Sequence, residues 1–64
     1  MVKINGEEIA VKGMRLTDYL LQEGYQLSRI AVECNGEIVP KAEYDVKVLQ
    51  DDDTLEIVSF VGGG

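Results

Sequence analysis

Residues 2–12 read VKINGEEIAVK, with apolar and polar residues alternating on both sides of Asn5-Gly6. Asn-Gly between two alternating runs is a strong hairpin signal, because both residues tolerate the positive φ of a type I′ turn. The stretch therefore predicts two antiparallel strands joined by a tight turn. The residues expected to face the core are Val2, Ile4, Ile9 and Val11.

A short helix is predicted next, over residues 16–23. Leu16, Tyr19 and Leu20 lie at positions i, i+3 and i+4, which share one face of a helix. Thr17 has the side chain of an N-cap residue, and Gly24 is placed to end the helix in the left-handed region.

A third strand is predicted over residues 30–34, with Ile30, Val32 and Cys34 on one face. A second Asn-Gly pair at 35–36 turns the chain into a short strand over 37–39. Pro40 then ends the pairing, because proline has no backbone donor.

The stretch from residue 41 to residue 53 has a weaker pattern. Residues 41–44 are expected to form one irregular or helical turn, and Val46, Val48 and Leu49 to fill the core beneath it. Three consecutive aspartates at 51–53 predict an acidic turn.

The last predicted strand covers residues 54–61, and glycines follow it directly. Glu56 marks the solvent side, since an unpaired buried carboxylate is costly. Val58 and Phe60 have the same parity, so they are expected to be apolar residues on an exposed face, which often marks a partner surface. The alternative is that Phe60 folds back over a sheet edge.

This order of strands around one helix predicts an α+β architecture, with a small mixed sheet packed on the helix. It fits the β-grasp topology, in which the last strand pairs with the first in the middle of the sheet. We expect one β-grasp domain over residues 1–61 and a flexible glycine tail over residues 62–64.

The composition narrows the function. Twelve acidic residues against six basic ones give a net charge of −6, which argues against nucleic-acid binding. No apolar run approaches the roughly 18–20 residues that span a membrane, and no secretory signal is evident. A single cysteine cannot form an internal disulfide, which fits the cytoplasm.

The chain lacks most catalytic equipment. It has no histidine, no phosphate-binding loop and no dinucleotide motif. Asp51-Asp52-Asp53 lacks the alternate spacing of a calcium loop, so we expect no metal site there. Cys34 shares the parity of its buried neighbours and has no obvious cation beside it, which favours a core role over a reactive thiol. We therefore predict no catalytic residue in this chain.

The glycine run at 62–64 is the strongest functional signal. Glycine offers no side-chain contact and loses much entropy when ordered, so three in a row stabilise nothing. They provide a slim backbone arm about 10 Å long that ends in the carboxylate of Gly64. The alternative is a frayed terminus.

The chain resembles the ThiS family of ubiquitin-like sulfur carrier proteins over essentially all of its residues. The resemblance rests on three stretches, which read VKING at 2–6, VECNGEIVP at 32–40 and IVSFVGGG at 57–64. It implies a carried substrate and not an enzyme. A ThiF-like adenylating enzyme would use ATP and Mg²⁺ to activate the Gly64 carboxylate, so no cofactor would be bound by the carrier itself.

The resemblance also implies the later steps. A sulfur donor, such as a cysteine desulfurase persulfide, would displace AMP and leave a thiocarboxylate at Gly64. The carrier would then dock on a ThiG-like thiazole synthase and deliver sulfur for thiamin biosynthesis. The implied partner-binding residues are Val58, Phe60, Val61, Gly62 and Gly63.

Other functions stay open. The small subunit of molybdopterin synthase has the same fold and tail, although prolines often precede its glycines and Pro40 is the only proline here. Further alternatives are a sulfur carrier of another pathway, a protein-conjugating modifier, and a plain binding module with a disordered tail.

Overall fold

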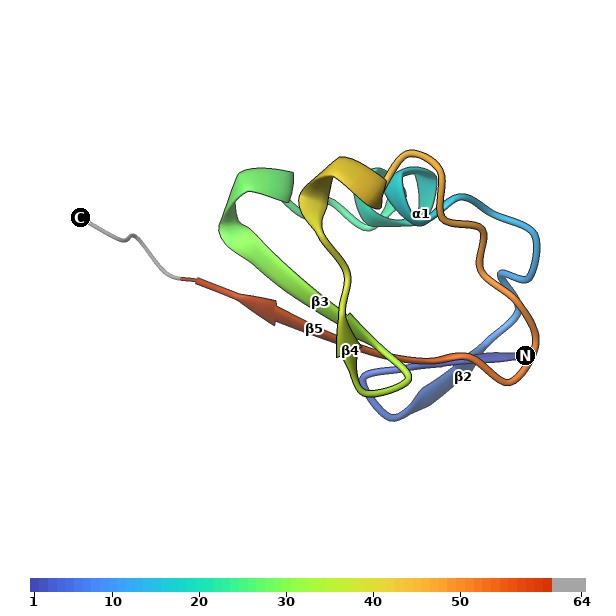
Figure 1. The fold of residues 1–64 in the computed structure, drawn as a ribbon. Coiled ribbons are helices and arrows are strands. Elements are labelled where there is room, and N and C mark those ends of the chain that lie inside the picture. The colour runs from blue at the N-terminus through green and yellow to red at the C-terminus, as the bar shows by residue number, and fades with distance from the viewer. Residues whose placement is uncertain (61–64) are drawn as a thin grey trace.

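A five-stranded mixed sheet carries one helix on one of its faces, in a computed structural model that describes residues 1–60 (Figure 1). The strands lie in the order β2-β1-β5-β3-β4. The central pair β1–β5 is parallel and the other pairs are antiparallel. The elements in chain order are β1 (Val2–Ile4), β2 (Glu7–Ile9), α1 (Leu16–Gln22), η1 (Leu27–Arg29), β3 (Ile30–Cys34), β4 (Glu37–Ile38), η2 (Lys41–Glu43) and β5 (Thr54–Ser59).

The predicted β-grasp fold is thereby confirmed. The last strand lies beside the first in the middle of the sheet and runs outward beyond it (Figure 1). The structure assigns β5 to Thr54–Ser59, shorter than the predicted 54–61, and Val61 lies outside the described residues.

Both Asn-Gly pairs form the predicted tight turns. Asn5 and Asn35 have φ angles of 49° and 53°, in the left-handed region, and a glycine with positive φ follows each. Because the first turn has only two residues, Ile4 pairs directly with Glu7, and the pairing ends where Val2 meets Ile9. The second strand therefore stops at Ile9 and does not continue over 10–12 as the alternation had suggested.

The two turn asparagines also hold β5 from both sides. Asn5 accepts a hydrogen bond from the Ile57 N–H at 2.7 Å and donates from Nδ2 to the Ile57 carbonyl at 3.3 Å. Asn35 accepts from the Thr54 N–H at 2.9 Å. Each side-chain amide thus imitates a strand backbone and extends the ladder past the end of the neighbouring strand.

The N-terminus of α1 differs from the prediction. The helix begins at Leu16, with Arg15 as the N-cap and no side-chain cap. The N–H groups of Leu16 and Thr17 instead donate to carbonyls of Lys47 and Tyr44, at 2.8 and 3.1 Å. The Thr17 hydroxyl donates to Asp45 at 2.9 Å. Thr17 is therefore not the N-cap, because a tertiary contact supplies the acceptors that a cap would provide.

The C-terminus of α1 is as expected. Gly24 has a φ of +83°, and its N–H donates to the Leu21 carbonyl. The Tyr25 N–H donates to the Leu20 carbonyl at 3.0 Å. These two bonds form a Schellman motif, which glycine favours because it has no Cβ to clash in the left-handed region.

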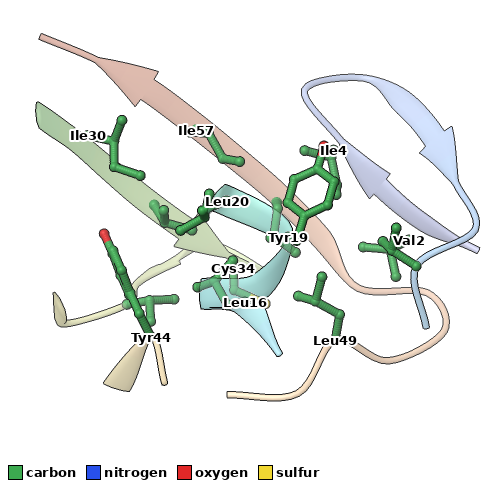
Figure 2. Close-up of a cluster of buried hydrophobic side chains, with 14 residues drawn as sticks. Val2, Ile4, Leu16, Tyr19, Leu20, Ile30, Cys34, Tyr44, Leu49 and Ile57 are labelled. Carbon is green, nitrogen blue, oxygen red and sulfur yellow. The ribbon is translucent and has the colours of Figure 1, made fainter. Parts of the chain in front are cut away.

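The core lies between the sheet and α1, as Figure 2 shows. Its fully buried members come from both layers, and the largest are Leu16, Leu20, Ile30, Leu49, Leu55, Val2 and Val32. The predicted helical face is confirmed, because Leu16, Tyr19 and Leu20 are all buried.

The prediction for the stretch before β5 is only partly right. Leu49 is fully buried, but Val46 and Val48 are 72% and 44% exposed. Residues 47–49 run extended against residues 13–16, with Leu49 exchanging backbone hydrogen bonds with Gly13 and Met14. Side chains of adjacent residues in an extended segment point to opposite sides, so Leu49 reaches the core and Val48 does not. Val46 lies before this segment, in the turn that follows η2.

Cys34 is a core residue, as predicted. It is 7% exposed and lies on the inward face of β3. Burial is the main cause that raises the pKa of its thiol, and the nearby Asp53 carboxylate raises it further. The thiol is therefore neutral at ordinary pH.

We predict that Asn5→Gly lowers the free energy of unfolding by about 1–2 kcal/mol, because the Ile57 N–H loses its acceptor. Glycine keeps the positive φ, so the loss measures the side-chain contacts and not the turn. Asn5→Asp retains an acceptor oxygen and should lose less. Urea denaturation followed by circular dichroism measures both variants, and equal stability of Asn5→Gly and wild type would refute the role assigned to this amide.

We also predict that iodoacetamide modifies Cys34 in the folded chain roughly tenfold or more slowly than in the urea-unfolded chain at pH 8. Because burial raises the pKa of the folded thiol, the thiol contribution to stability is complete below the unfolded-state pKa and is lost as the pH rises through the higher folded-state pKa. Mass spectrometry of the time course gives both rates. Comparable rates would show that the thiol is accessible and reactive.

Candidate functional site

At the end of β5, two of the predicted partner-binding residues lie at the surface. Val58 and Phe60 are 56% and 55% exposed, while Leu55 and Ile57 of the same strand are buried. The alternation predicted this division. Phe60 is therefore not buried in the core, although it lies near the β3 edge over which the alternative would fold it.

A backbone contact fixes the position of Phe60. Its N–H donates to the Arg29 carbonyl at 2.7 Å, one step beyond the last β3–β5 pair, which joins Ile30 and Ser59. Phe60 is thus held to the sheet through its backbone while its ring stays at the surface.

Two grooves meet at Phe60. The first has a volume of about 260 Å³ and is mostly apolar. Its lining residues are Ser28, Ile30, Ala31, Val32, Ile38, Val39, Pro40, Lys41, Tyr44 and Phe60. The second has a volume of about 300 Å³ and is lined by Gly24, Tyr25, Gln26, Arg29, Ile30, Ser59 and Phe60. Phe60 therefore forms part of the wall of both grooves.

Lys41 shapes the first groove and protects the sheet edge beside it. Its Nζ donates to the carbonyls of Leu27 and Ile30, each at 2.7 Å, and lies 5.8 Å from the Tyr44 ring centroid. Because β4 covers only the far end of β3, the Ile30 carbonyl lies beyond the strand pairing. A lysine at such a place blocks the addition of another strand.

Two further apolar residues, to which the sequence pattern gave no role, lie on the same face of the sheet as Val58. Ala31 is directly opposite Val58 in the β3–β5 register, and Ile38 is opposite Glu33 in the β3–β4 register. Ile38 is 66% exposed, whereas Val39 beside it is buried. Because Ile38 and Val39 are adjacent in an extended segment, their side chains point to opposite sides, so burial of Val39 indicates exposure of Ile38.

The remaining predicted site residues are Val61, Gly62, Gly63 and Gly64. They lie outside the described residues. The described residues end at Phe60, directly before these four.

The acidic turn at 51–53 is occupied by structural contacts. Asp51 forms ion pairs with the N-terminal ammonium and with Lys12, and the ammonium is the main cause that lowers the pKa of its carboxyl. Asp53 accepts hydrogen bonds from Asn35 Nδ2 at 3.0 Å and from the Gln50 N–H at 3.0 Å. These carboxylates therefore hold the start of β5.

Residues 1–60 contain neither a candidate metal site nor a candidate membrane-spanning helix. No cluster of three or more histidine, cysteine, aspartate or glutamate side chains in this range has the arrangement of a metal site. Among the same residues, no helix has both the length and the apolar character needed to cross a membrane.

Comparison with known proteins gives matches over nearly the whole chain. The family model of the ThiS family matches residues 2–64. The sulfur carrier protein ThiS of Bacillus subtilis is 41% identical over 66 residues, which cover 100% of both chains. The crystal structure of a thiamine biosynthesis protein (ThiS) from Geobacter metallireducens superposes with a TM-score of 0.74 at 30% identity, covering 98% of this chain and 97% of that one.

A longer relative is also similar. A protein named thiazole synthase from Paramagnetospirillum magneticum is 47% identical over 62 residues. The match covers 95% of this chain but only 19% of that protein, so the chain spans about a fifth of its length. The family model, the full-length relative and the solved structure agree, and the chain belongs to the ThiS family.

Proposed function

We propose that this chain is a sulfur carrier protein, which receives sulfur at the Gly64 carboxylate and donates it for thiazole formation in thiamin biosynthesis. The observation that carries the proposal is the family match, which continues through the glycine tail to residue 64. The fold supports it, because β5 lies in the centre of the sheet and leads directly to that tail.

The proposed chemistry begins with activation. A carboxylate is a poor electrophile, so an oxygen of Gly64 attacks the α-phosphorus of ATP and pyrophosphate leaves. The acyl-adenylate that results has AMP as a good leaving group. In this proposal a ThiF-like enzyme holds ATP and Mg²⁺, and no cofactor is bound by the carrier.

Sulfur transfer follows in two steps. The terminal sulfur of a cysteine persulfide, supplied by a cysteine desulfurase, attacks the acyl carbon and expels AMP. This step forms an acyl disulfide between Gly64 and the donor cysteine. A thiol then attacks the sulfur that belongs to the cysteine. The thiocarboxylate leaves on Gly64, and the donor cysteine ends in a disulfide with that thiol, so the thiol is the reductant.

The properties of the described residues are consistent with a carrier that does no catalysis of its own. Cys34 is the only thiol of the chain, and it is buried with a raised pKa. The partner enzymes would supply the acid, base and nucleophile. A single free cysteine also fits action in the cytoplasm, where thiols stay reduced.

The proposed recipient of the sulfur is a ThiG-like thiazole synthase. Support comes from the Paramagnetospirillum protein of that name, a fifth of which is similar to nearly all of this chain. A carrier segment within the synthase itself would need no separate docking step. For a separate chain, docking must come from a surface, and Val58 and Phe60 at the root of the tail are the proposed contacts, followed by Val61, Gly62 and Gly63.

Incubation with the adenylating enzyme, ATP, Mg²⁺ and a persulfide donor is expected to convert the carrier to a thiocarboxylate. Intact-mass spectrometry should show the exchange of one oxygen for sulfur, and fragmentation should place it on Gly64. Deletion of Gly64, or addition of one alanine after it, should abolish the product without changing the melting temperature. Failure of the wild-type chain to form this species would refute the carrier function.

Phe60→Ala is expected to weaken binding to thiazole synthase by about 5–30-fold, because aromatic anchors dominate interfaces. Its ring is half exposed, so stability should fall by less than about 1 kcal/mol. Val46→Ala is the matched control, since it truncates an exposed apolar residue on another part of the surface. Calorimetric titration and thermal melts measure the two effects, and a larger loss of stability than of binding would place Phe60 in the core.

A further inference from the structure

One face of the sheet packs on α1, and no other element of residues 1–60 covers the opposite face (Figure 1). Three apolar side chains lie on this outward face at neighbouring register positions. Val58 of β5 is opposite Ala31 of β3, and Ile38 of β4 is opposite Glu33, two residues further along β3. Val58 and Ile38 are both more than half exposed.

Two glutamates border these residues at the same register position. Glu33 and Glu56 are direct Cα partners across β3 and β5, and both are exposed. Like charges directly opposite each other destabilise a sheet. All six basic residues of the chain lie within 1–60, and in that range neither glutamate forms a salt bridge. Lys3, the basic residue of β1, is opposite Glu8 of β2 and Thr54 of β5.

The pair therefore disfavours the free protein, and no salt bridge within residues 1–60 offsets the repulsion. A cation placed between the two carboxylates would remove the repulsion and gain two charge-assisted contacts. This gain arises only in a complex, so it adds to the affinity of a partner that supplies such a cation. The apolar residues beside the pair supply contact area that does not depend on charge.

We propose that the outward sheet face of Val58, Ala31 and Ile38, together with Glu33 and Glu56, docks a basic surface of thiazole synthase. The complementary surface has an apolar centre and an arginine or lysine that reaches between the two carboxylates. The inference rests on the proposed function for the identity of the partner. The net charge of −6 also favours a basic partner surface, because it steers the carrier toward positive charge.

The test uses Glu33→Gln and Glu56→Gln, which remove one charge and keep the size of the side chain. Glu43→Gln is the matched control, because it removes the same charge from exposed η2. Either sheet variant should raise the melting temperature by about 1–4 °C. Each should also weaken binding to purified thiazole synthase by about 3–10-fold and reduce its dependence on salt concentration. Glu43→Gln should do neither.

The outcomes are distinct. Sheet variants that bind as tightly as wild type, or that lose no more affinity than Glu43→Gln, overturn the docking face. A wild-type carrier that forms the thiocarboxylate but does not bind the synthase also overturns it, while leaving the carrier chemistry intact. A chain that binds the synthase through this face but never forms a thiocarboxylate supports the face and overturns the proposed function.

Discussion

The parallel pairing of β1 with β5 is the contact on which the rest of the molecule depends. It joins the two ends of the chain, through the pairs Lys3–Thr54 and Ile4–Leu55. Only two residue pairs form this ladder, and the Asn5 side chain extends it to Ile57. Pairing β1 with β5 closes the whole chain between them into a loop, which is entropically unfavourable, so burial must support the contact. Leu55 and Ile57 supply that burial beneath it.

The central position of β5 explains how one strand serves two purposes. Its inward residues anchor the strand in the core, and its outward residues are left for a partner. A strand at the sheet edge would be held from one side only and would expose unpaired backbone groups. Because β5 is held by β1 and β3, Phe60, the last described residue before the tail, has a fixed place relative to the outward face.

Much of the fold follows from local signals. The Asn-Gly turns depend on which residues tolerate positive φ, and the buried face of α1 depends on helical spacing, so both could be predicted. The errors concern contacts between distant segments. Thr17 looked like an N-cap because the carbonyls of Lys47 and Tyr44 that replace the cap belong to a segment about 30 residues away. Val48 looked buried because hydrophobicity alone does not say which side of an extended segment meets the core, and Val46 because it does not show that this residue lies in a turn.

The candidate site shows the same limit in another form. The exposure of Val58 and Phe60 followed from the parity of Glu56, a signal within one strand. The apposition of Glu33 and Glu56 depends on the register between β3 and β5, which neither strand specifies alone. A shift of one residue would turn the inward residues of β5 toward solvent, so burial of Leu55 and Ile57 fixes the register and thereby places the two carboxylates together. The requirement of the core thus places two like charges at directly opposite register positions on the other face, where the proposed basic partner surface would neutralise them.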